Sequence, residues 1–145
     1  MFILMESPSK IDTMAVEQES AKKIDSKTFQ GKIEFRDVWF RYPTRIEQWV
    51  FKGLNMTVYP NETVAVVGES GAGKSTFINL VMRFYDPESG SVLIDDIDVR
   101  DYNIHALRLQ MGLVMQEPTL FDYPIKDNIL YGAAEASNAQ IQAAA

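Results

Sequence analysis

The amino-acid sequence predicts an α/β fold in which a β-region of two half-buried strands precedes a further strand, a glycine-rich loop and a helix. Two observations support this fold. Segments that alternate apolar and polar residues lie between positions 31 and 58, which is typical of half-buried strands. A short β-branched run at residues 63–67 then leads through a loop at residues 68–76 into an apolar pattern of helical period, so we expect a buried strand, a loop and a helix.

Residues 1–30 are predicted to form a linker ahead of a folded domain at residues 31–145. From Glu6 to Phe29 the sequence is rich in Ser, Lys, Glu and Gln and has little periodicity. A starting segment without a role is the alternative. The apolar opening at residues 1–5 is far shorter than the roughly 20 residues of a spanning helix, and it lacks the features of a signal peptide.

Two strands are predicted in the β-region. Residues 33–38 alternate apolar with charged side chains, and Pro43 then ends the pattern because proline cannot continue a strand ladder. Residues 50–58 form the second run, which alternates from Leu54 onward. Residues 59–62 are predicted to turn, with Asn61 in a left-handed conformation.

The glycine-rich loop fits the pattern G-x-x-x-x-G-K-[ST], with Gly68, Gly73, Lys74 and Ser75 at the fixed positions. Glycines let such a loop wrap tightly, so that its backbone N–H groups converge on a polyphosphate. Lys74 would add a positive charge for the β- and γ-phosphates, and the Ser75 hydroxyl is the expected Mg²⁺ ligand. The motif therefore predicts phosphate binding.

The helix after the loop is predicted from Phe77, Leu80, Val81 and Phe84, which fall on one face. Residues 86–90 break the pattern. Residues 91–99 allow two interpretations. A strand ending at Asp95 and Asp96 could hold Mg²⁺. We favour an antiparallel ribbon with a turn at residues 95–98, because only a short helix separates it from Lys74.

The remaining segments alternate short helices with one strand. Asn103 is expected to cap a helix through Leu109, in which His105 is a surface residue. Residues 111–115 are predicted as a strand that ends at Gln116, where open α/β sheets bind ligands. Gln116 is therefore a candidate for the metal or a water near the γ-phosphate, and a solvent-exposed loop glutamine is the alternative. Residues 124–132 suggest a helical turn closed by Gly132, and a helix pattern begins at Asn138.

Composition excludes several classes of protein. The 145 residues are 46% hydrophobic and 23% charged, which is ordinary for one globular domain. The net charge of −6 argues against nucleic acid as a partner, because phosphate backbones require clustered Lys and Arg. There is no cysteine, so the chain has neither disulfides nor thiolate chemistry.

Five motifs occur in a fixed order. They are Phe40-Arg41-Tyr42-Pro43-Thr44-Arg45, the loop at residues 68–76, Tyr85-Asp86-Pro87, residues 114–121, and Asn128-Ile129-Leu130-Tyr131-Gly132. With them the sequence resembles the nucleotide-binding domain of ATP-binding cassette (ABC) transporters, and it is most similar to the multidrug-resistance, P-glycoprotein-like exporters of subfamily B. The resemblance runs from about Gly31 to the end and implies the P-loop NTPase core of an ABC ATPase, with an N-terminal antiparallel β subdomain.

The resemblance also implies roles for individual residues. Tyr42 would stack on adenine and Val50 would touch the same ring. ATP phosphates would lie on the loop, whose residues are Gly68, Glu69, Ser70, Gly71, Ala72, Gly73, Lys74, Ser75 and Thr76. Lys74 and Gln116 would be the catalytic residues, while Ser75 and Gln116 would hold Mg²⁺. The implied partners are ATP, the transmembrane domain of a parent transporter at the cytoplasmic face of a membrane, and a second nucleotide-binding domain in a head-to-tail sandwich.

Two departures from the family qualify these roles. Asp96 stands where the family's hairpin usually has glycine, which we expect to strain the turn. The helical subdomain, the Ser-Gly-Gly signature, the catalytic glutamate and the switch histidine are missing, so the chain resembles the N-terminal half of the domain, truncated before the helical subdomain. We expect it to bind nucleotide with almost no turnover by itself. The alternatives to part of an export ATPase are a binding module without hydrolysis and, less favoured, a small P-loop kinase.

Overall fold

The computed structural model describes Ile11, Ile24 and residues 28–117, 120–133 and 135–144. These residues divide into two compact units, Met1–Gly112 and Leu113–Ala145. Apart from a few of its residues, the predicted linker at 1–30 lies outside the described residues, so its conformation stays a prediction.

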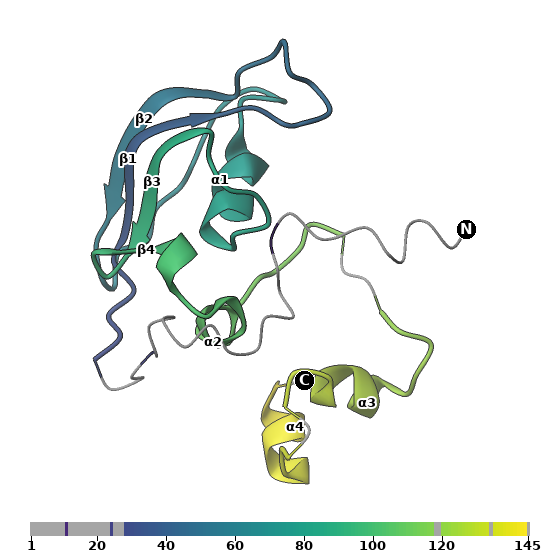
Figure 1. Cartoon of the computed structure of the whole chain (residues 1–145). Coiled ribbons are helices and arrows are strands. Elements are labelled where there is room, and N and C mark those ends of the chain that lie inside the picture. The colour runs from purple at the N-terminus through teal and green to yellow at the C-terminus, as the bar shows by residue number, and fades with distance from the viewer. Residues whose placement is uncertain (1–10, 12–23, 25–27, 118–119, 134, 145) are drawn as a thin grey trace. The chain divides into compact units, whose positions relative to one another are not determined.

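The first unit is built on a four-stranded sheet with the strand order β2-β1-β3-β4 (Figure 1). Its strands are β1 (Ile33–Phe40), β2 (Phe51–Val58), β3 (Ser89–Ile94) and β4 (Ile97–Asp98). All three pairings between neighbours are antiparallel, with Ile33 of β1 opposite Val58 on one side and Ile94 on the other. The predicted strands at residues 33–38 and 50–58 and the ribbon at residues 91–99 are confirmed.

Both units contain helices. The first unit contains α1 (Lys74–Val81), the 3₁₀ helix η1 (Val99–Asp101) and α2 (Ile104–Arg108), and the second contains α3 (Ile125–Leu130) and α4 (Asn138–Ala144). Asn103 caps α2 as predicted, since its side chain accepts from Ala106 N–H at 2.9 Å, and His105 is exposed. None of the described helices has the length and the apolar run that crossing a bilayer requires.

The core of the first unit lies between the sheet and α1, which runs beside one face of the strands (Figure 1). Phe35 of β1 stacks on Phe77 of α1 with ring centroids 4.2 Å apart, and Leu80 is fully buried. The buried members of this core are Phe35, Val38, Phe40, Leu80, Val81, Val92, Ile94, Val99, Tyr102 and Leu107. Burying this apolar surface holds α1, and with it the loop at its start, against the sheet.

Two predicted strands are not strands in this structure. Residues 63–67 and 111–115 form no ladder with any strand of the described residues. Val67 is 87% exposed and Val114 is 96% exposed. A fully apolar strand is normally stabilised by neighbours on both sides and by covering on both faces. The described sheet offers these segments neither, so the prediction of strands there was wrong for this structure.

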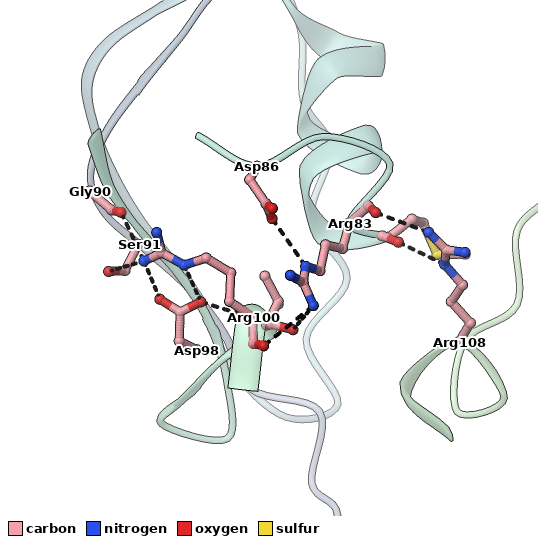
Figure 2. A network of polar contacts seen from close by, with 9 residues as sticks. Arg83, Asp86, Gly90, Ser91, Asp98, Arg100 and Arg108 are labelled. Atoms are coloured by element: carbon pink, nitrogen blue, oxygen red, sulfur yellow. Dashed lines mark hydrogen bonds and ion pairs between the residues drawn. The ribbon is translucent and has the colours of Figure 1, made fainter. Parts of the chain in front are cut away.

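Helix α1 is shorter than predicted because Arg83 takes a left-handed conformation with φ 50°. Phe84, which we placed on the same helical face as Leu80 and Val81, follows this break and is 43% exposed. Arg108 of α2 donates to the carbonyls of Met82 and Arg83 at 3.0 and 2.9 Å (Figure 2). A cation at the carbonyl end of a helix also suits the helix dipole.

Arg83 extends the same network toward η1. Its side chain pairs with Asp86 at 3.1 Å and donates to the carbonyl of Arg100 at 3.3 Å (Figure 2). Arg100 in turn donates to Asp98 at 2.6 Å. The C-terminal end of α1 is therefore hydrogen-bonded to η1 and held by Arg108 of α2, the next two elements after β4. These contacts fix the direction of the helix that starts at the loop.

The second unit is organised by the side chain of Asn128. Its amide oxygen accepts from Phe121 N–H at 2.8 Å, and its nitrogen donates to the carbonyls of Phe121 and Tyr123 at 3.1 and 2.9 Å. Phe121 also packs on Tyr131 with centroids 4.6 Å apart. One asparagine thus closes the loop ahead of α3, and α3 itself confirms the predicted helical turn at residues 124–132. The predicted closure by Gly132 is not seen, because Gly132 is not among the glycines with positive φ. The helix ends at Leu130, before Gly132.

Candidate functional site

The glycine-rich loop has the backbone that its sequence predicts. Gly71 and Gly73 have φ of 85° and 93°, a region that side chains disfavour. Ala72 N–H donates to the carbonyl of Glu69 at 3.2 Å, which closes a tight turn. Helix α1 then begins at Lys74 with Gly73 as its N-cap, and no side chain caps its first amides. The first turn also holds no acidic residue, so nothing on α1 itself opposes an anion at its positive end.

Lys74 folds back across the loop that precedes it. Its ammonium donates to the carbonyls of Gly68 at 2.7 Å and Glu69 at 2.6 Å. An ammonium has three N–H donors, so these two bonds leave one for another acceptor. Ser75, the next residue, is exposed. A positive charge and a hydroxyl are thus presented together at the start of α1.

Val50 lies beside the loop. A Cβ on Gly73 would be 2.6 Å from Val50 Cγ1 and 2.9 Å from Phe51 Cε1. Only glycine fits this approach, in addition to the backbone conformation that it permits. The start of β2 and the end of the loop are therefore packed directly against each other.

Tyr42 is attached to α1 by its hydroxyl. The Tyr42 oxygen lies 2.9 Å from Thr76 Oγ1 and accepts from Asn79 Nδ2 at 3.0 Å. Its ring packs edge-on against Phe40 and Tyr85, with centroids 5.0 and 5.2 Å apart and interplanar angles of 80° and 89°. Thr76 is only 3% exposed. The Thr76 side chain is therefore buried against Tyr42.

The structure thus brings Tyr42, Val50 and the loop together in the first unit. Gln116 is exposed and belongs to the second unit, so its approach to the loop stays a prediction. Sequence reasoning did not single out Asn79. The available signal was its spacing of three residues from Thr76, which places both side chains on one face of a helix.

A cavity of about 500 Å³ lies next to Lys74 and Ser75. Most of its wall is apolar, and it is not where Tyr42 and Val50 lie. Its lining includes Glu62, an acidic residue whose charge does not favour a triphosphate. A polyphosphate is therefore better matched to the surface of the loop, which has backbone amides and the Lys74 ammonium, than to this cavity. The wall residues are Val58, Glu62, Val64, Val66, Lys74, Ser75, Phe77 and Ile78.

The two aspartates at the β3–β4 turn have structural partners. Asp95 accepts from the backbone N–H groups of Gln30, Gly31 and Lys32 at 2.8, 3.2 and 2.9 Å. The Asp96 carboxylate bonds the Lys32 ammonium at 2.7 Å, which raises the pKa of Lys32. These contacts agree with the ribbon interpretation and give the carboxylates a role other than metal binding.

The residues of the loop fit a magnesium ion that arrives with a polyphosphate. Among the described residues, no three of His, Cys, Asp and Glu are grouped so that they could hold a metal. Mg²⁺ commonly keeps several waters and takes only one or two protein ligands besides substrate phosphates. One exposed hydroxyl from Ser75 suits that arrangement.

Comparison with known proteins matches the chain to one family. A family model described as "ABC transporter" matches residues 51–145. The chain is 46% identical over its whole length to multidrug resistance protein homolog 65 of Drosophila melanogaster. It is 49% identical over 91% of its length to leptomycin B resistance protein pmd1 of Schizosaccharomyces pombe. A bacterial Atm1-family ABC exporter solved with ATP bound matches 99% of the chain with a TM-score of 0.84 and 34% identity.

The chain is covered almost completely in these comparisons, but it spans only a small part of each relative. The chain spans 11% of the Drosophila protein, 9% of the yeast protein and 24% of the exporter chain. The similarity therefore concerns one region of each of these much longer proteins.

Proposed function

We propose, from the premise that this chain belongs to the ABC transporter family, that its loop at residues 68–76 binds the phosphates of Mg²⁺-bound ATP. The observation that carries the proposal is the start of α1. Two glycines with positive φ lead into a helix whose first amides have no side-chain cap, and the Lys74 ammonium sits across the same loop. Backbone donors, a helix dipole and a fixed cation are the groups that bind polyphosphates.

Each predicted residue has a chemical task in this proposal. Lys74 neutralises charge on the β- and γ-phosphates, and the amides at the start of α1 donate to phosphate oxygens. Ser75 and Gln116 would hold Mg²⁺, which draws charge away from the phosphates when it is bound. Tyr42 would stack its ring on adenine, and Val50 would touch the adenine ring. Both residues lie beside the loop. Gln116 would also orient the attacking water.

The larger assembly is proposed by analogy with the relatives. They carry names that describe multidrug and leptomycin B resistance, and one solved relative is an ABC exporter. We propose that this region is the P-loop NTPase core of an ABC ATPase. It would act at the cytoplasmic face of a membrane with a transmembrane domain, and with a second nucleotide-binding domain placed head to tail. ATP binding and hydrolysis would then drive substrate export.

The 145-residue chain alone should bind nucleotide with almost no turnover. Hydrolysis needs a group that positions or activates water and a full set of charges around the γ-phosphate. Lys74, Ser75 and Gln116 supply only part of that set. Asp95 is already bonded to three backbone amides, so it is a poor substitute for a catalytic carboxylate.

A paired measurement tests this proposal. Binding of a fluorescent ATP analogue and steady-state phosphate release would be followed for the full chain and for Lys74→Ala. We expect saturable binding that weakens in the variant, and phosphate release near the background in both. Robust Mg²⁺-dependent release that Lys74→Ala abolishes would contradict the absence of turnover. It would point to Asp95 or Asp96 as a metal ligand after all.

A further inference from the structure

We infer that Asn79 is a positioning residue for the nucleotide base, because it fixes the tyrosine on which the base is proposed to stack. The inference rests on the proposed function of Tyr42. It goes beyond it by assigning a role in base recognition to a residue outside the phosphate loop and outside every motif that the sequence presents.

The spacing of Thr76 and Asn79 on α1 explains how both side chains reach Tyr42. Thr76 and Asn79 are three positions apart, so their side chains emerge on the same face of the helix. Both reach the phenol oxygen of Tyr42, at 2.9 and 3.0 Å, across 34 and 37 residues of sequence. A tyrosine hydroxyl has one donor and two lone pairs. Two partners on one rigid helix therefore fix where the end of the ring lies.

The ring is also held from its sides. Phe40 and Tyr85 both meet it nearly at right angles, and the Tyr42 carbonyl accepts from Arg45 N–H at 2.9 Å in the turn after β1. The hydroxyl end lies next to Thr76, which is 3% exposed. Hydrogen bonds shielded from water in this way are stronger and hold geometry better than exposed ones.

One helix thus controls both ends of the proposed ligand. Lys74 and Ser75 face the phosphate end from its first turn. Thr76, in the same turn, and Asn79, in the next, hold the tyrosine on which the base is proposed to stack. A platform that is already oriented loses less entropy when a base stacks on it. Loss of the Asn79 contact should therefore weaken binding of nucleotides that carry a base, and should leave a bare polyphosphate unaffected.

The test compares Mg²⁺-bound ATP with Mg²⁺-bound inorganic tripolyphosphate on the full chain by calorimetry. Asn79→Ala should weaken ATP roughly 3- to 10-fold, the scale of one hydrogen bond, and change tripolyphosphate by less than about twofold. Tyr42→Phe keeps the ring and removes the hydroxyl, so it should have a similar effect. The double variant should be no weaker than the weaker single variant, because both changes remove the same contact.

A second measurement detects the hydrogen bond between Asn79 and Tyr42 in the absence of nucleotide. The Asn79 side-chain amide signals, assigned by their loss in Asn79→Ala, should shift in the NMR spectrum of Tyr42→Phe. The matched control Tyr59→Phe alters an exposed tyrosine and should leave them in place. Unshifted signals in Tyr42→Phe would overturn the inference.

The possible outcomes distinguish a failure of the inference about Asn79 from a failure of the proposed nucleotide binding. A chain that binds neither ATP nor tripolyphosphate would refute both. Normal binding of both ligands by the wild type, with equal losses for both in Asn79→Ala, would mean that the residue only supports α1 and would overturn the inference alone. Additive losses in the double variant would do the same.

Discussion

Gly90 of β3 lies directly against the backbone carbonyl of Asp37 in β1, so that no side chain fits between the two strands at this point. Asp37 has φ 46° and Gly90 has φ 82°. The register of β1 against β3 shifts between Arg36 and Trp39, which marks a β-bulge here. The bulge bends β1 just before the segment that carries Tyr42.

Gly90→Ala should destabilise the first unit by about 2–3 kcal/mol or more, because the new methyl group collides with backbone that cannot move aside. Urea unfolding followed by tryptophan fluorescence would measure this. Gly112→Ala is the matched control, since a Cβ there meets nothing within 4 Å. Equal stability of the two variants would contradict the close approach of β3 and β1.

Substitutions of the two aspartates in the β3–β4 turn should change the stability of the first unit in opposite directions. Asp95 and Asp96 both have positive φ, 50° and 64°. Asp96→Gly should stabilise the unit by about 0.5–1 kcal/mol, because glycine adopts this conformation without strain and the exposed ion pair with Lys32 contributes little. Asp95→Ala should destabilise it by about 1–3 kcal/mol, because three backbone amides lose their acceptor. Thermal melting checks both signs, and a stabilising Asp95→Ala would refute the anchoring role.

Acid should weaken the contact between Asp98 and Arg100. Burial alone would raise the pKa of Asp98, but hydrogen bonds from the Arg100 side chain and backbone outweigh it, and the pKa lies below its ordinary value of 3.8. A depressed folded-state pKa contributes stability that is present above the unfolded value and is lost as pH falls through the folded one.

Asp98→Asn should therefore be less stable than the wild type at pH 7, and the difference should shrink as pH falls from about 5 to 2. Denaturant midpoints at several pH values would show this convergence. A difference that stays constant down to pH 2 would mean that the carboxylate charge plays no part.

Tyr42 should act through its ring. Tyr42→Ala should weaken ATP by about 1–3 kcal/mol, using the scale of base stacking in nucleic-acid complexes. Tyr42→Trp keeps an aromatic face and loses only the hydroxyl contacts with Thr76 and Asn79, so it should weaken ATP no more than Tyr42→Phe does. ATP and GTP should differ little, because every base has a π-face. Competition titrations check these values. A large loss of folding in Tyr42→Ala with unchanged affinity would make Tyr42 a packing residue instead.

Local patterns predicted most of the first unit. The alternation around Ile33 and Leu54, the cap at Asn103 and the glycines of the loop are each decided by a few neighbouring residues, and the structure agrees with them. The sequence also indicated the turn at Asp95, although not that its carboxylate would hold the amides of residues 30–32.

Most of the failures come from contacts between segments that are distant in sequence, and one comes from a local break in a helix. The run at residues 63–67 has the composition of a buried strand, but a strand exists only where others pair with it. Phe84 has the spacing of a helical face, but Arg83 ends the helix first. The contact of Asn79 with Tyr42 joins positions 37 residues apart, and no periodicity in one segment reveals such a pair.

The central claim is that the loop around Lys74 is the binding site for Mg²⁺-bound ATP, and calorimetric titration of the full chain tests it most directly. The wild type should bind one equivalent, and Lys74→Ala should bind at least about 10-fold more weakly, since one charge-assisted contact is worth roughly 1.5–3 kcal/mol. Lys52→Ala, which removes an exposed charge on β2, should bind as the wild type does. Equal affinity of the wild type and Lys74→Ala would show that the loop is not the site.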